Sequence, residues 1–347
     1  MKKPLIGAAA AALAGIGIAL AANSASVAQT PAPIPIRFSL DWNFEGPAAP
    51  FLLALENGYF AEEGLLVTID SASGSLEPIN RVASGTYDMG FGDINSLIKF
   101  RDANPAVGMK AVYMVYNYPA FSIVGRRSLG INTPADLEGR TLGAPAPDGA
   151  YAQWPIFVQA NGIDASRVTI ENVGFPVREP MLAAGEVDAV TGFSFSSYFN
   201  LIRAGVPADD INVMLMAEYG VNLYGNAIIV GDAFAEENPE AVAAFLRAFT
   251  RALKETIADP AAAAAYVAAA NPVADLATET ARLQMAIDQN ILTDEVRANG
   301  FGGVDMARLT TAIDQIALTY TFTGALPTPE SVFDPQYLPD AALRAVE

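Results

Sequence analysis

Short apolar runs alternate with helical stretches along the chain from about residue 34 to residue 230. The runs are rich in Val, Ile, Leu and Phe and are bounded by Gly, Pro, Asn or Asp, which predicts strands separated by helices. This alternation is typical of an α/β fold. The expected strands are Ile34–Asp41, Leu66–Ser71, Asp88–Gly92, Lys110–Tyr116, Phe121–Arg126, Arg140–Ala144, Val168–Val173, Val187–Thr191, Ile211–Met216 and Gly225–Val230.

Helical spacing of apolar residues predicts helices between these strands and throughout the C-terminal region. Pro or Asp at several starts and Gly at several ends support the boundaries. The main expected helices are Ala48–Glu63, Tyr151–Asn161, Glu179–Ala184, Phe195–Ala204, Pro239–Asp259, Pro260–Ala270, Ala274–Asn290 and Met306–Thr321.

The N-terminus has the pattern of an export signal. Lys2 and Lys3 precede an apolar run that continues to about Ala22, and Ser26-Val27-Ala28 supplies the small residues of a cleavage site. We therefore expect residues 1–28 to be a signal peptide. A retained membrane anchor is the alternative, because the apolar run is just long enough to span a bilayer. We expect no stable membrane insertion after cleavage.

Composition narrows the function. Hydrophobic residues make up 52% of the 347 residues and charged residues only 17%, which fits a well-buried globular protein large enough for two lobes. The net charge of −18 argues against nucleic acid or anionic lipid as a partner. The chain has no histidine and no cysteine, which excludes Ser-His-Asp and Cys-His catalysis and disfavours a transition-metal site. We expect no metal and no cofactor.

Several short sequence motifs follow one another in a characteristic order. Asp41-Trp42 is followed by a helix that ends in Gly58-Tyr59-Phe60, and later motifs recur at each βα step. The later motifs are Arg81–Asp88 (RVASGTYD), Asp136–Gly143 (DLEGRTLG), Ala184–Ala189 (AGEVDA), and Asn238-Pro239-Glu240 with Asp259-Pro260. Over residues 36–270, this order resembles periplasmic binding proteins of the NMT1/THI5-like group, which includes nitrate, sulfonate, taurine and thiamine-precursor receptors. Arg140 stands where that group usually has Lys.

The resemblance implies a type II, Venus-flytrap periplasmic-binding-protein fold: α/β, two-lobed, with a helical C-terminal region. Residues 29–125 would form the first part of lobe 1, residues 126–220 lobe 2, and residues 221–347 the return to lobe 1 and the C-terminal helices. The chain would cross between lobes near Val124–Arg127 and Glu218–Tyr224. It would be a periplasmic, monomeric receptor that binds a small-molecule solute in the interlobe cleft and docks on the permease subunits of an ABC importer.

Candidate ligand contacts lie in the loops that end strands and open helices, because such loops present free backbone N–H groups and polar side chains. Helix capping is the alternative role for the Ser and Asp residues, and we expect it for Ser75 and Asp164. Trp154 and Phe157 have helical spacing that is typical of a core. The predicted ligand-binding residues are Asp41, Trp42, Asn43, Phe44, Ser73, Gly92, Asp93, Asn95, Tyr118, Asp148, Tyr151, Phe193, Ser194, Glu218 and Tyr219.

The charges of these loops indicate the class of ligand. They carry several carboxylates and hardly any Lys or Arg, whereas an anionic ligand usually needs an Arg fork or a ring of N–H donors. Arg178 and Arg81 are the candidate cations, and a surface pair with Glu179 is the alternative role of Arg178. We therefore favour a planar, nitrogen-containing solute such as a thiamine-precursor pyrimidine. A sulfonate, taurine or an aromatic carboxylate is the alternative, since backbone N–H groups can bind sulfonates without Arg.

Two other functional classes compete with transport. The THI5 branch of the resembled group includes pyrimidine-synthesising enzymes that use histidine and a Cys-rich motif, and this chain has neither residue. A secreted hydrolase would need two carboxylates about 5–9.5 Å apart in a groove, and no catalytic signature is visible. We therefore expect a binding protein rather than an enzyme. A ligand-sensing module of a membrane receptor would share the same cleft.

Overall fold

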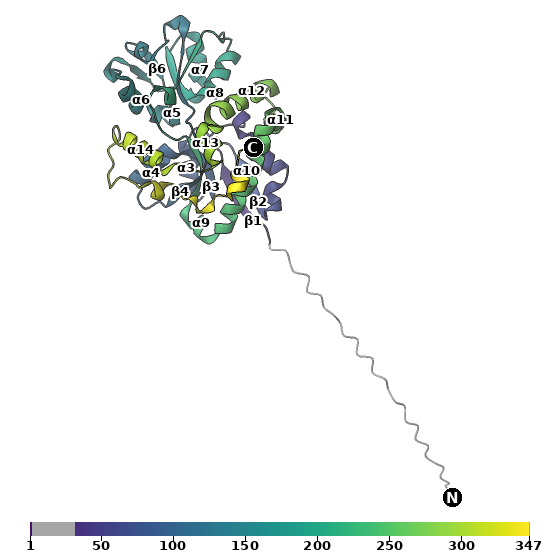
Figure 1. The fold of residues 1–347 in the computed structure, drawn as a ribbon. Helices are drawn as coiled ribbons and strands as arrows, with labels where there is room; N and C mark the ends of the chain where they lie inside the picture. The colour runs from purple at the N-terminus through teal and green to yellow at the C-terminus, as the bar shows by residue number, and fades with distance from the viewer. Residues whose placement is uncertain (2–31, 347) are drawn as a thin grey trace. The chain divides into compact units, whose positions relative to one another are not determined.

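Two five-stranded sheets organise the computed structural model, which describes Met1 and residues 32–346 (Figure 1). Residues 33–347 form one body, and the expected signal peptide lies outside the described residues apart from Met1. The first sheet has the order β2-β1-β3-β10-β4, with β1 Ile34–Ser39, β2 Leu65–Asp70, β3 Met89–Asp93, β4 Met109–Met114 and β10 Asn226–Gly231. The second has the order β7-β6-β8-β5-β9, with β5 Phe121–Arg126, β6 Thr141–Gly143, β7 Thr169–Glu171, β8 Ala189–Phe193 and β9 Ile211–Leu215.

Each sheet contains one antiparallel strand, and in each case it is the first strand after the chain changes sheets. β5 runs antiparallel to β8 and β9, and β10 runs antiparallel to β3 and β4. The expected first crossing at Val124–Arg127 is therefore wrong, because all of β5 pairs within the second sheet. The chain crosses earlier, between β4 and β5, and returns between β9 and β10. We call the parts built on the two sheets the first lobe and the second lobe.

Helices surround both sheets (Figure 1). The longer ones are α1 Ala49–Glu56, α3 Leu76–Ala83, α4 Ile94–Ala103, α6 Trp154–Asn161, α7 Phe175–Ala184, α8 Ser194–Arg203, α10 Pro239–Ala258, α11 Pro260–Ala270, α12 Leu276–Ala286 and α14 Met306–Ala317. The shorter ones are α2 Tyr59–Glu62, α5 Gly149–Ala152, α9 Asp232–Glu237, α13 Asp294–Asn299, α15 Pro329–Val332 and α16 Ala341–Arg344. A π-helical turn, Ile287–Ile291, continues α12, and short 3₁₀ turns include Gly46–Ala48 and Met216–Tyr219.

Local sequence explains two departures from the expected helices. Gly58 has φ +75°, a left-handed conformation that ends α1 and separates it from α2, so the single helix expected over Ala48–Glu63 is two helices. α7 begins at Phe175, four residues earlier than expected, although it contains Pro176 and Pro180. Pro176 lies in the first turn, where the missing N–H has no helical partner in any case.

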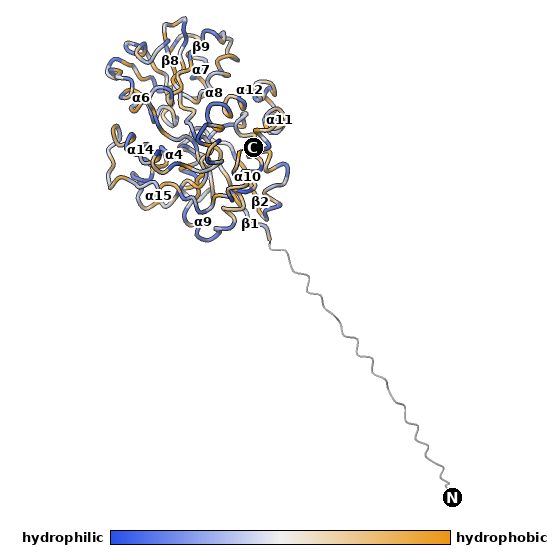
Figure 2. Tube along the Cα trace, viewed as in Figure 1, coloured by the Kyte–Doolittle hydropathy of each residue, from blue (hydrophilic) through white to orange (hydrophobic). Residues whose placement is uncertain are grey.

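The core of the first lobe is a stack of aromatic rings beneath α1 and α10. The ring of Phe38 on β1 lies 5.1 Å from that of Phe51 and 4.9 Å from that of Phe245, centroid to centroid. In the second lobe, Trp154 and Phe157 are buried, which confirms the expected core role. Figure 2 shows apolar and polar positions interleaved along both lobes, as amphipathic elements around two cores require. Within the described residues, no helix is both long and apolar enough to cross a membrane.

Candidate functional site

A pocket lies between the two lobes, where the carboxyl ends of several strands face one another. It encloses about 580 Å³ of space, part of which is open to solvent. Its first-lobe lining is Leu40, Asp41, Trp42, Asn43, Glu45, Pro47, Ala48, Phe51, Gly74, Ser75, Phe91 and Tyr116. Its second-lobe lining is Asp148, Phe175, Arg178, Phe193, Phe195 and Ser196.

Asp41 follows β1 and is a buried carboxyl in the wall of this pocket. Its Oδ2 accepts a hydrogen bond of 2.7 Å from Nδ2 of Asn226, the first residue of β10. Burial raises the pKa of Asp41 to about 7, and the nearby Glu45 and Asp93 carboxylates add to this shift. The group is therefore poised between its neutral and charged forms near neutral pH, so that it can donate or accept a hydrogen bond.

Trp42 brings an aromatic surface and an unused donor to the same loop. Its indole ring meets the ring of Phe175 edge to face, with centroids 4.7 Å apart. Its Nε1 is buried and has no hydrogen-bond partner among the described residues. A buried donor without a partner is uncommon in a native structure, and a binding site is one of the places where it occurs.

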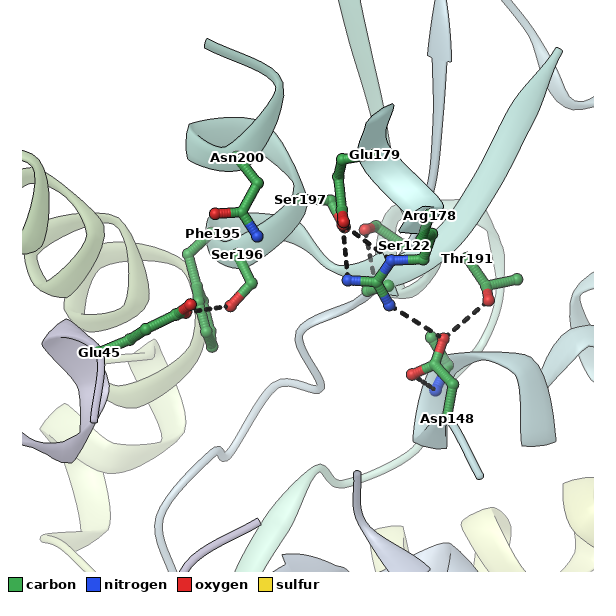
Figure 3. A network of polar contacts seen from close by, with 12 residues as sticks. Glu45, Ser122, Asp148, Arg178, Glu179, Thr191, Phe195, Ser196, Ser197 and Asn200 are labelled. Atoms are coloured by element: carbon green, nitrogen blue, oxygen red, sulfur yellow. Dashed lines mark hydrogen bonds and ion pairs between the residues drawn. The ribbon is translucent and has the colours of Figure 1, made fainter. Parts of the chain in front are cut away.

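The second lobe contributes a buried charge cluster (Figure 3). Arg178 on α7 is 2% exposed, and its guanidinium lies 2.6 Å from Oε1 of Glu179 and 3.7 Å from Oδ2 of Asp148. Asp148 also accepts a hydrogen bond of 2.7 Å from Oγ1 of Thr191. Burial raises the pKa of Asp148, although Arg178 opposes this shift. The expected surface pair of Arg178 with Glu179 is therefore wrong in one respect: the pair exists, but it is buried beside the pocket.

The structure brings five of the predicted ligand-binding residues into the pocket lining. They come from the loop after β1, from the N-cap of α5 and from the end of β8, and they are Asp41, Trp42, Asn43, Asp148 and Phe193. Their contact with a ligand stays a prediction. Their common feature is the position that sequence reasoning relied on, at the carboxyl end of a strand.

The other ten predicted residues lie outside this lining. Asp93 is fully buried and accepts five hydrogen bonds, from Asn95, Ser96 and Gln153, so it caps α4. Ser194 donates instead to Gln289. The full set outside the lining is Phe44, Ser73, Gly92, Asp93, Asn95, Tyr118, Tyr151, Ser194, Glu218 and Tyr219.

For Ser75, the predicted helix-capping role is wrong. It was expected to cap a helix, but its side chain makes no capping hydrogen bond, and it lines the pocket. Asp164, by contrast, caps the turn Ala165–Arg167, as expected.

The set of predicted ligand-binding residues omits four of the six second-lobe lining residues, although the sequence does indicate one of the four, Arg178, as a candidate cation. Phe175 and Arg178 enter the pocket from the first turns of α7, a segment whose two prolines hide the helix. Phe195 and Ser196 enter from the first turn of α8. The sequence signal that could have identified Phe195 and Ser196 is their position directly after β8, since Phe193 was predicted from its position at the end of the same strand. Among the described residues, no group of three or more acidic side chains could hold a metal ion.

Comparisons with known proteins give relatives of two kinds. The formylaminopyrimidine-binding protein of Halalkalibacterium halodurans is 30% identical over 230 residues, which cover 65% of this chain and 67% of that protein. The riboflavin-binding protein RibY of Chloroflexus aurantiacus is 27% identical over 214 residues, 61% of this chain and 59% of that protein. The 4-amino-5-hydroxymethyl-2-methylpyrimidine phosphate synthase of Aspergillus parasiticus is 28% identical over 237 residues, 65% of this chain and 68% of the enzyme.

The fold matches that of solved binding proteins. The periplasmic aliphatic sulphonate binding protein SsuA from Escherichia coli superposes with a TM-score of 0.69 at 14% identity, covering 88% of this chain and 99% of that one. A family model described as NMT1/THI5 like matches residues 47–263, more than half of the chain. The chain therefore has the two-lobed α/β fold of periplasmic binding proteins and belongs to the NMT1/THI5-like family.

Proposed function

We propose that this protein is the solute-binding component of an ABC importer and that it holds a small, planar, nitrogen-containing solute in the interlobe pocket. A thiamine-precursor pyrimidine is the favoured ligand. The observation that carries the proposal is the composition of the pocket wall, which combines aromatic residues from both lobes with the acidic residues Asp41, Glu45 and Asp148.

The carboxyl groups suit a ligand that donates hydrogen bonds. Ring-amino N–H groups can donate to Asp41 and Glu45, while the faces of the heterocycle pack against aromatic rings. The unpartnered Nε1 of Trp42 could donate to a ring nitrogen or a carbonyl oxygen. A heterocycle with both donors and acceptors would thus satisfy polar groups that are costly to leave unpaired in a buried site.

The charge balance of the pocket disfavours an anion. Arg178 is the cation in the lining, and two carboxylates, Glu179 and Asp148, already neutralise it. An anionic solute would approach a wall on which acidic groups outnumber this one guanidinium. A sulfonate or an aromatic carboxylate is the second candidate, because the guanidinium-bearing Arg178 lines the pocket and a sulphonate binding protein has the same fold.

The names of the relatives support the same ligand class. Two of the relatives are named as binding proteins for formylaminopyrimidine and for riboflavin, both nitrogen heterocycles. Other relatives are named as synthases, and the lack of any histidine or cysteine in this chain supports a binding role over a catalytic one. We further propose that the protein acts as a monomer in the periplasm, after export by its N-terminal signal, and delivers the solute to a permease.

A thermal-shift screen of residues 29–347 tests this function. The panel contains aminopyrimidines, thiamine, riboflavin, purines, taurine, alkane and aryl sulfonates, nitrate and aromatic carboxylates. A ligand at 100 times its Kd stabilises the folded state by about 2.7 kcal/mol, which raises the melting temperature of a protein of this size by several degrees. We expect hits among the amino-heterocycles, with affinity confirmed by calorimetry.

The control for the screen is Ser73→Ala, which changes an exposed residue outside the pocket lining and is expected to bind like the unmodified protein. Hits confined to sulfonates or carboxylates would overturn the ligand class and move attention to Arg178. A panel without any hit would contradict the proposed solute class as a whole.

A further inference from the structure

A buried guanidinium joins the C-terminal helices to the second lobe. Arg282 on α12 is 2% exposed, and its Nη1 donates to the carbonyl oxygens of Phe195 and Ser196 at 3.2 and 3.3 Å. Its Nη2 donates to Oδ1 of Asn200 at 3.4 Å. All three acceptors belong to α8 of the second lobe, whereas α12 packs on the first-lobe core through Leu283 and Ala286. Arg282 therefore bonds across the boundary between the lobes.

Glu45 links this guanidinium to the pocket. Its Oε2 lies 3.0 Å from Nη1 of Arg282 and accepts a hydrogen bond of 2.8 Å from Oγ of Ser196. Figure 3 shows Glu45 reaching from the first-lobe turn toward Ser196 at the start of α8. Because Glu45, Phe195 and Ser196 also line the pocket, the groups that hold the lobes together are part of the ligand-binding wall.

A second carboxylate fixes Arg282 from its own side. Oε2 of Glu279 accepts from Nε of Arg282 at 3.1 Å and from the backbone N–H of Gly46, the residue after Glu45, at 2.6 Å. The planar guanidinium thus uses its fork of donors on two carboxylates, two carbonyls and an amide. Opening the cleft would break all of the bonds from Arg282 to α8 at once, and it would expose the same charged groups to water.

We propose that Arg282 is a positioning residue that holds the Glu45 carboxylate in the pocket wall and the first turn of α8 against it, so that lobe closure depends on this one side chain. The bonds from Arg282 and Glu45 to α8 act as a latch between the lobes. The part of this proposal that concerns solute affinity rests on the proposed function; the part that concerns closure does not.

The distance between the lobes in the ligand-free protein tests the latch. The chain contains no cysteine, so a spin-label pair can be introduced at two exposed alanines, Ala61 in the first lobe and Ala184 in the second. We expect Arg282→Met to lengthen and broaden the distance distribution measured by double electron–electron resonance. Arg282→Lys should give an intermediate distribution, since one ammonium group cannot satisfy all of these acceptors.

The matched control is Arg247→Met, which removes ion pairs with Glu63 and Glu240 inside the first lobe and should leave the distribution unchanged. Glu45→Gln combined with Arg282→Met should widen the distribution no more than Arg282→Met alone, because both changes break the same latch. If Arg282 only stabilises the fold, its replacement would lower the melting temperature without widening the distance distribution between the lobes. The proposal is overturned if Arg282→Lys and every folded Arg282 variant keep the distance distribution of the unmodified protein.

Solute binding gives the second readout. For the best hit of the screen, Arg282→Met is expected to raise Kd at least about tenfold, as removal of one partner of a buried charge pair does at other interfaces. An unchanged Kd in a folded Arg282→Met variant would overturn the link to the pocket. If the screen yields no ligand, the distance measurement still decides whether the latch exists.

Discussion

At the residue scale, Asp41 couples the pocket to pH. Its pKa is raised to about 7 by burial, so between about pH 4 and pH 7 the folded protein holds a proton that the unfolded chain has released. The free energy of unfolding therefore falls as the pH rises through this window, by up to about 4 kcal/mol from this group. We predict that Asp41→Asn removes this part of the slope and is more stable than the unmodified protein at pH 8, as measured by urea unfolding.

The control for Asp41 is Glu218→Gln, an exposed carboxylate outside the pocket lining, which should leave the pH profile unchanged. Parallel pH profiles for the Asp41→Asn variant and the unmodified protein would contradict the assignment of this slope to Asp41.

Trp42 is the predicted ligand contact that is easiest to test by substitution. It is only half-buried and its ring meets that of Phe175 in a T-shaped pair at the pocket wall, so its removal is expected to open the pocket more than it disturbs the core. We predict that Trp42→Ala raises Kd for the solute tenfold or more, because stacking and the Nε1 donor are both lost. Calorimetry measures the affinity and circular dichroism the fold. Unchanged affinity would remove Trp42 from the site.

At the element scale, Asp93 starts α4. Its carboxyl group accepts from the backbone N–H groups of Asn95 and Ser96 in the first turn, at 3.0 and 2.8 Å. We predict that Asp93→Ala lowers the free energy of unfolding by about 2 kcal/mol or more in urea, because two backbone N–H groups and three side-chain donors lose a buried partner. Asp93→Ser keeps a capping oxygen and should recover part of the loss. Loss of solute affinity at full stability would instead favour the ligand role that the sequence suggested.

The elements also show what a sequence can predict. Strands such as β5 can be predicted because they are apolar runs bounded by turn residues. Asp41 and Trp42 could be predicted near the pocket because they follow such a strand, β1. The start of α7 could not be predicted in the same way, because Pro176 and Pro180 are helix-breaking residues in most sequence contexts. Capping and ligand contact use the same residue types in the same loops, and sequence alone did not separate them: Ser75 lines the pocket without capping a helix, whereas Asp93 caps α4 outside the lining.

At the scale of the whole molecule, two lobes must be joined by crossings that hold a defined geometry. Arg308 on α14 contacts both crossings: its Nη2 donates to the carbonyl oxygens of Asn117 at 2.8 Å and Leu223 at 2.9 Å. Its guanidinium also lies 3.9 Å from the ring centre of Tyr224. These partners are separated from Arg308 by 84 or more positions in the chain, so no local pattern could have predicted the contact.

The crossings should therefore loosen together when Arg308 is replaced. We predict that Arg308→Gln speeds hydrogen exchange in both segments, residues 115–120 and 220–226, and lowers the free energy of unfolding by about 2 kcal/mol or more, because two buried carbonyls lose a charged donor. Arg297→Gln, an exposed arginine on the neighbouring α13, should leave both segments unchanged. Faster exchange in one segment alone would mean that the crossings are anchored separately, and Arg308 would then set only one of the two connections about which the lobes move.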